Sequence, residues 1–157
     1  MRALSYLIPE AQEYKIICVG KSKRRYFEKL AQICNLTERV LFCPPSHEIE
    51  KYYGLADVFV LPTLYDPFSN VCLEAMACGV PVITSTSNGA SEIIEHGVSG
   101  YVLTNPRDEK ELALFLIKLL NENLRYEIGK NAAQSVQSFT IENNMAQTLR
   151  VCEEIAS

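Results

Sequence analysis

Short apolar runs alternate with longer amphipathic segments along the 157 residues of the chain, and this alternation most constrains its fold. Five runs have the length and the flanking Gly or Pro residues of strands: residues 14–19, 39–43, 57–61, 80–84 and 100–103. The first, YKIICV, ends at Gly20 and is typical of a parallel strand covered on both faces. We therefore expect an α/β fold, a Rossmann-like parallel sheet with helices on both faces, in one domain over residues 1–157.

Helical segments separate and follow these runs. We expect helices over residues 26–34, 48–54, 70–78, 90–96, 108–120, 124–136 and 140–155. The carboxyl ends of the strands define the crevice where an open α/β sheet binds its ligand.

The composition of the chain argues against several classes of protein function. A net charge of -4 argues against a general nucleic-acid surface, which requires a basic excess. No apolar run approaches the roughly 20 residues that span a bilayer, and no signal peptide is visible. The six cysteines have no C-x-x-C spacing, which predicts reduced, mostly buried thiols and a cytoplasmic protein.

The stretch LYDPFSNVCLEAMACGVPVIT, residues 64–84, contains the candidate site. Asp66 and Glu74 stand eight positions apart around a turn that opens a helix near Asn70. A helix start presents unpaired N–H groups and the positive end of the helix dipole, so it suits a phosphate. The two carboxylates are then placed to accept hydrogen bonds from hydroxyl groups at opposite ends of a sugar nucleotide. The structural alternative makes Glu74 a favourable helix acid and Asp66 a turn-forming residue.

A longer stretch, PTLYDPFSNVCLEAMACGVPVITSTSNGASEIIEHGVSGYVL, resembles the signature of retaining GT-B glycosyltransferases, glycosyltransferase family 4. The usual form of that signature is PSxxEPFGLVxLEAMAxGxPVIxxxxGGxxExVxxGxxG, and its E-x(7)-E element maps onto Asp66 and Glu74. The chain departs from it at Asp66 in place of Glu, at Ser69 in place of Gly, and at Asn88 in place of the first Gly of the GG pair. The shorter Asp66 requires the donor sugar to sit closer, or a water to bridge.

The resemblance implies roles for residues that match the motif. Asp66 is the candidate catalytic residue and orients the donor hexose, while Glu74 binds the ribose. The same resemblance gives backbone N–H contacts with sugar and phosphate to Phe68, Ser69, Asn70 and Val71, and base contacts to Phe42, Cys43 and Pro44. Lys23 is a candidate diphosphate contact on another ground, because the cations near the start of the helix over residues 26–34 are unfavourable to its dipole unless an anion offsets them. For the cations between Lys21 and Arg25, plain solvation is the alternative.

The resemblance also implies the C-terminal half of a GT-B fold, a donor-binding domain truncated at its N-terminus and without its acceptor domain. The expected donor is a nucleoside-diphosphate sugar similar to UDP-glucose, used with no cofactor and no obligatory metal. A glycan or lipid-linked acceptor reaches the site through the missing domain. The segment GKSKRRYFEKLA is similar to lipopolysaccharide core glucosyltransferases, which suggests cell-surface polysaccharide synthesis and peripheral association of the full-length protein with the inner face of the membrane.

Two other functions stay open at this stage. The chain fits a nucleotide-binding or interaction module without turnover, which carries Asp66 and Ser69 where an active enzyme has Glu and Gly. It also fits a GT-B-like epimerase, but such an enzyme needs an acid-base residue, and His47 has no partner nearby in the sequence.

Overall fold

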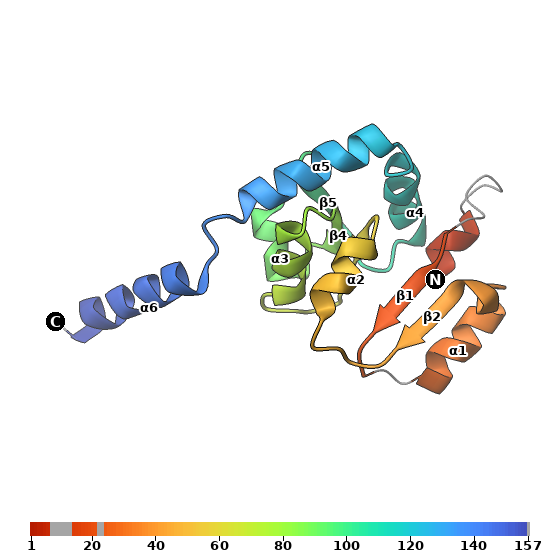
Figure 1. Ribbon diagram of the computed structural model, residues 1–157, viewed down its shortest axis with the longest axis horizontal. Coiled ribbons are helices and arrows are strands. Elements are labelled where there is room, and N and C mark those ends of the chain that lie inside the picture. Colours follow the sequence, from red (N-terminus) through yellow and green to blue (C-terminus); the bar gives the residue numbers. More distant parts are fainter. Residues whose placement is uncertain (7–13, 22–23, 157) are drawn as a thin grey trace.

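The computed structural model describes residues 1–6, 14–21 and 24–156. Its strands form two parallel sheets (Figure 1). One sheet pairs two strands and the other three, in the orders β1-β2 and β3-β4-β5: β1 (Ile16–Val19), β2 (Val40–Cys43), β3 (Phe59–Val60), β4 (Val82–Ser85) and β5 (Gly100–Leu103). Every pairing is parallel, which confirms the expected α/β class.

The strands form two parallel sheets, whereas we expected one. Among the described residues β1 pairs with β2 and β3 pairs with β4, but no ladder joins β1 to β3. The alternation of runs along the sequence identifies the strands, whereas the pairing depends on which strand edges come within about 4.8 Å of each other.

The helices occur where the sequence predicts them, with bounds that differ by one or two residues for six segments. These six are α1 (Arg24–Ile33), α2 (Ile49–Leu55), α3 (Asn70–Ala77), α4 (Glu109–Lys118), α5 (Glu122–Ser135) and α6 (Ile141–Ala156). Short 3-10 turns add η1 (Arg2–Tyr6), η3 (Thr37–Arg39) and η4 (Gly89–Ile93).

The helix expected over residues 90–96 is instead the shorter η4. It ends early because the backbone N–H of Glu95 donates to Ser99 Oγ at 2.9 Å. The chain then turns through Gly97, whose N–H donates to the carbonyl of Gly100 at the start of β5.

Apolar side chains cover both faces of the three-stranded sheet. Val82 of β4 belongs to one buried cluster together with Met76 of α3, while the next residue, Ile83, belongs to a second cluster with Phe115 of α4. Successive residues of a strand point to opposite faces, so these two clusters lie on opposite sides of the sheet. Helices on both faces are therefore confirmed, and Figure 1 shows β4 and β5 enclosed by α3, α4 and α5.

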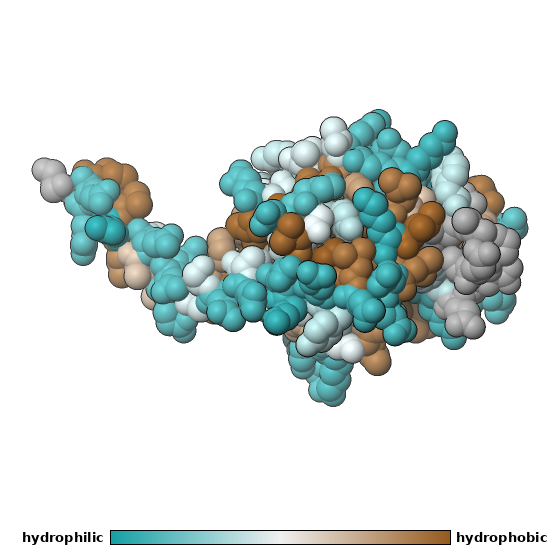
Figure 2. Space-filling view, turned by 90° about the horizontal axis from the view of Figure 1, so that it is seen from above, coloured by the Kyte–Doolittle hydropathy of each residue, from teal (hydrophilic) through white to brown (hydrophobic). Residues whose placement is uncertain are grey.

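The last helix, α6, projects away from the rest of the molecule (Figure 1). It has no buried residue, and its large apolar side chains are exposed, including Ile141, Met145, Leu149 and Ile155. Figure 2 shows hydrophobic residues on this projecting helix as well as over the main body.

Within the part of the chain that the structure describes, no helix combines the length and the apolarity needed to cross a bilayer.

Candidate functional site

The predicted turn and helix between β3 and β4 are present. The chain enters α3 at Asn70, with Ser69 as the extended N-cap residue. Gly79 adopts a left-handed backbone with a φ of 73°, and its N–H donates to the carbonyl of Met76 at 2.9 Å. Gly79 therefore ends α3 as expected, and β4 follows.

Two loops meet at the carboxyl ends of β3 and β4. The N–H of Asp66 donates to the carbonyl of Ser87, and the N–H of Gly89 donates to the carbonyl of Asp66, each at 3.0 Å. A Cβ atom on Gly89 would lie 1.9 Å from the Pro67 carbonyl oxygen, so only glycine fits this approach. The loop that contains Asp66 and the loop after β4 thus form one edge beside α3.

Asn88 joins these loops through its side chain, which is only 1% exposed. Its Oδ1 accepts from the backbone N–H of Ser69 at 3.3 Å and of Ala90 at 3.1 Å. Its Nδ2 donates to Thr84 Oγ1 at 2.9 Å and lies 3.5 Å from Cys72 Sγ. The sequence signal for this role is the departure itself, an amide where the family signature has Gly.

The two candidate acids lie on either side of the first turn of α3. Asp66 Oδ1 accepts from the N–H of Phe68 at 3.2 Å, which fixes the turn into the helix. Glu74 is the fifth residue of α3 and is exposed. Its Oε2 accepts from the hydroxyl of Tyr53, on α2, at 3.0 Å. Sequence reasoning missed Tyr53, because no spacing rule relates α2 to α3.

The four expected backbone donors divide into two pairs. The N–H groups of Phe68 and Ser69 have partners within the protein, Asp66 and Asn88. Asn70 and Val71 form the start of the helix, where the helical ladder supplies no acceptor for N–H groups, and both residues are exposed. An anion at this helix start would therefore bind the N–H groups of Asn70 and Val71.

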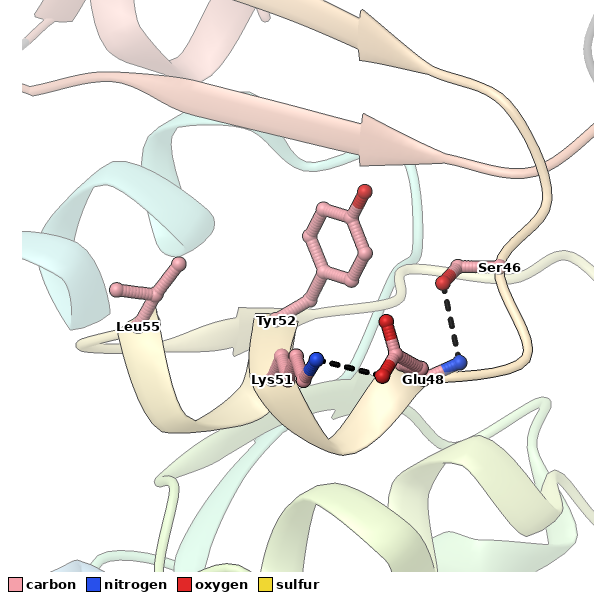
Figure 3. A pocket seen from close by; sticks show the side chains of 5 residues that line it. All are labelled: Ser46, Glu48, Lys51, Tyr52 and Leu55. Atoms are coloured by element: carbon pink, nitrogen blue, oxygen red, sulfur yellow. Dashed lines mark hydrogen bonds and ion pairs between the residues drawn. The ribbon is translucent and has the colours of Figure 1, made fainter.

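Phe42 and Cys43 end β2 and are half-buried. The loop after them and α2 line a pocket of about 260 Å³, formed by Ser46, Glu48, Lys51, Tyr52 and Leu55. Figure 3 shows the ring of Tyr52 pointing from α2 toward the strands of the first sheet. A hydrogen bond with the Cys43 side chain raises the pKa of Tyr52, so the pocket adjoins the residues expected at the base.

The polar residues at the mouth of this pocket are paired with one another. Ser46 Oγ accepts from the N–H of Glu48 at 3.1 Å, and the Glu48 carboxylate pairs with the ammonium of Lys51 (Figure 3). Lys23, the expected diphosphate contact, lies outside the described residues. Within residues 1–6, 14–21 and 24–156 no group of three or more His, Cys, Asp or Glu side chains is arranged to hold a metal.

All six cysteines are free thiols, but the expectation that most are buried is wrong. Only Cys72 is buried, and burial raises the pKa of its thiol. Cys78 and Cys152 are exposed. Cys78 is the C-cap of α3, where the helix surface turns toward solvent, and Cys152 lies on the projecting α6.

Comparison with known proteins identifies the family of the chain. Residues 1–135 match the family described as Glycosyl transferases group 1. An uncharacterized glycosyltransferase of Methanocaldococcus jannaschii is 31% identical over 156 residues, which are 96% of this chain and 40% of that protein. Sucrose-phosphate synthase of Thermosynechococcus elongatus has a TM-score of 0.86 and 30% identity over 99% of this chain and 41% of its own. HepE of Anabaena, solved in complex with UDP-glucose, has a TM-score of 0.80 and 30% identity over 95% of this chain and 43% of its own.

The chain spans less than half of the length of each of these relatives. Its fold is an α/β arrangement of parallel strands and helices that corresponds to the C-terminal half of a GT-B structure. Since the family match covers residues 1–135, most of its length, the chain belongs to the Glycosyl transferases group 1 family.

Proposed function

We propose that this chain is the donor-binding domain of a retaining glycosyltransferase that uses a nucleoside-diphosphate sugar, with UDP-glucose as the first candidate. The observation that carries the proposal is the placement of Asp66 and Glu74 on either side of the α3 N-terminus, where exposed backbone N–H groups begin the helix. The likeness to HepE in complex with UDP-glucose supports this choice of donor.

Each residue has a role in this proposal. The N–H groups of Asn70 and Val71 and the helix dipole bind the diphosphate, which carries negative charge. Glu74 accepts hydrogen bonds from the ribose hydroxyls, and Asp66 accepts them from the hexose. Phe42 and Cys43 lie beside the base, next to the pocket lined by α2.

The chemical step needs charge stabilisation on the leaving group. The bond between the sugar C1 and the diphosphate oxygen breaks, and its electron pair leaves with the nucleotide. C1 then bonds to the acceptor hydroxyl oxygen, which approaches on the face that the leaving group vacates, and the proton of that hydroxyl passes to the departing diphosphate oxygen. The helix start stabilises the developing charge, so no metal is required by the proposal.

The proposal assigns acceptor binding to a second domain. The relatives are more than twice as long as this chain, and we propose that a second domain presents a glycan or lipid-linked acceptor. Synthesis of cell-surface polysaccharide or lipopolysaccharide, a cytoplasmic location and peripheral membrane association stay predictions. The chain by itself is expected to bind the donor without transferring the sugar.

Calorimetric titration with UDP, GDP, ADP and their glucose or mannose forms tests the proposal. We expect UDP to bind. Glu74→Ala should weaken UDP and UDP-glucose alike by about tenfold or more, since it removes hydrogen bonds to a charged group. Asp66→Asn keeps an oxygen for the Phe68 N–H and should weaken only UDP-glucose. Glu38→Ala, an exposed acid on η3, is the matched control and should change neither.

Two results would count against these assignments. A folded sample that binds none of the nucleotides would overturn the donor site. Equal losses for UDP and UDP-glucose in Asp66→Asn would remove the hexose from that carboxylate and would favour a nucleotide-binding module over a transferase.

A further inference from the structure

We infer that Tyr53 is a positioning residue, which holds the carboxylate of Glu74 ready for the ribose and so links α2 to the nucleotide site. This inference rests on the proposed function, because it concerns the acid assigned there to the ribose. Nothing in the motif around Asp66 and Glu74 includes Tyr53, which lies 21 residues before Glu74.

The contact is direct and its donor is rigid. The Tyr53 hydroxyl lies 3.0 Å from Glu74 Oε2 and 3.4 Å from the carbonyl oxygen of Val71. The residue is only 5% exposed and belongs to the buried cluster between α2, α3 and β4. Its ring meets the ring of Phe59 edge-on, with centroids 5.8 Å apart at 73°. The ring is thus packed from several sides while its hydroxyl reaches the α3 surface.

Glu74 needs such a partner because its own surroundings leave it exposed. A free glutamate samples many rotamers, and fixing it on binding costs part of the affinity. The hydroxyl of Tyr53 restricts the carboxylate before the nucleotide arrives. Preorganisation of this kind raises affinity without adding a contact to the ligand.

The hydroxyl remains a donor across the physiological pH range. Burial first, and then the hydrogen bond to Glu74, raise the pKa of Tyr53 well above its ordinary value. A phenolate would repel the carboxylate, whereas the neutral hydroxyl donates to it.

The position of Tyr53 also connects two parts of the proposed site. Helix α2 follows the loop that leaves Phe42 and Cys43, and it lines the pocket beside them through Tyr52. The next residue, Tyr53, faces the other way and contacts α3. One helix therefore borders the base region with one tyrosine and fixes the ribose acid with the next.

A double-mutant cycle on the 157-residue chain tests the inference, with UDP as the probe. Tyr53→Phe removes the hydroxyl and keeps the packed ring, and we expect it to weaken UDP binding by about fivefold. In a Glu74→Gln background the same change should cost less than about twofold, because its effect passes through the carboxylate. Tyr101→Phe, a buried tyrosine of the other apolar cluster, is the matched control and should leave the affinity unchanged.

A second readout is independent of the nucleotide. In protein labelled with ¹³C at the tyrosine ζ carbons, the Tyr53 signal is identified by its loss in Tyr53→Phe. Glu74→Gln should shift the Tyr53 signal and leave the Tyr101 signal in place. If Tyr53 only packed in the core without contacting Glu74, its signal would not shift.

The outcomes separate this inference from the proposed function. If the wild-type chain binds UDP and Tyr53→Phe binds it equally well, the positioning role is overturned and the donor site stands. If the Tyr53 signal does not shift in Glu74→Gln, the hydrogen bond between Tyr53 and Glu74 is refuted. If the wild-type chain binds no nucleoside diphosphate, the proposed function fails and the positioning role fails with it.

Discussion

Asn88 shows how one side chain can fix two loops of a binding edge. Its amide satisfies the backbone N–H groups of Ser69 and Ala90 and the hydroxyl of Thr84 in a fully buried position. A buried polar group lowers the stability of the fold when it lacks a hydrogen-bond partner. Loss of the Asn88 amide would therefore leave several buried groups without partners.

We predict that Asn88→Ala destabilises the chain by about 2–3 kcal/mol, because it leaves buried donors without an acceptor. Urea unfolding followed by circular dichroism measures the loss. Asn131→Ala is the matched control, since the Asn131 side chain makes one hydrogen bond, to the Val98 carbonyl, and should cost less than about 1 kcal/mol. Similar losses in both variants would show that the Asn88 network does not stabilise the loops.

At the residue scale the sequence predicts those features that depend on neighbours along the chain. The positions of Asp66 and Glu74 around a helix start, and the Gly79 stop, follow from local turn and capping chemistry. The contacts of Asn88 with Ser69 and of Tyr53 with Glu74 join segments 19 and 21 residues apart. They depend on how the strands bring these segments together, which no local pattern encodes.

The start of helix α4 is fixed by its N-cap residue. Asp108 is the N-cap of α4, and its Oδ1 accepts from the N–H groups of Lys110 and Glu111, each at 2.9 Å. Since α4 supplies Phe115 and Leu116 to the second apolar cluster, its start fixes how that cluster packs on β5.

Asp108→Ala should lower the free energy of unfolding by about 1 kcal/mol, the usual cost of removing an N-cap side chain. Asp108→Asn keeps a capping oxygen and is expected to retain most of the stability. The midpoint of urea unfolding should fall at constant slope, which indicates a stability change without a change in the surface exposed on unfolding. A midpoint that is the same for Ala and Asn would show that the cap contributes nothing.

The sequence predicts the bounds of helices and strands well where turn or cap residues flank them. Strand β5 matches the expected residues because it begins at Gly100 and Pro106 follows it, and the start of α3 matches because Pro67 and the N-cap Ser69 mark the turn before it. The segment after Gly89 was expected to be an α-helix, yet η4 ends at Ile93. The Glu95 N–H donates there to Ser99, which lies in the turn before β5, so this contact does not follow from the sequence of the expected helix itself.

At the scale of the whole molecule, the two sheets differ in burial. All four residues of β4 and three of four in β5 are buried, whereas β1 and β2 contain no buried residue. Ile17 and Leu41 are 41% and 57% exposed. The stable part of the fold is therefore the three-stranded sheet with its helices.

Hydrogen exchange should show this difference directly. We expect the amides of β4 and β5 to be protected about a hundredfold more than those of β1 and β2, because strands without buried side chains open at lower free energy. Exchange measured residue by residue by NMR tests this, and equal protection in the two sheets would contradict it. The expectation that the run YKIICV is a strand covered on both faces is wrong, since β1 has no buried residue and Ile17 is 41% exposed.

Helix α6 has a further consequence. Its 16 residues extend about 24 Å at the helical rise of 1.5 Å per residue. An isolated helix of this length is marginal in water, and no residue of α6 is buried against the body. The last tenth of the chain thus adds length and exposed apolar surface but does not stabilise the fold. The unfolding temperature of the rest of the molecule should therefore be the same with or without α6.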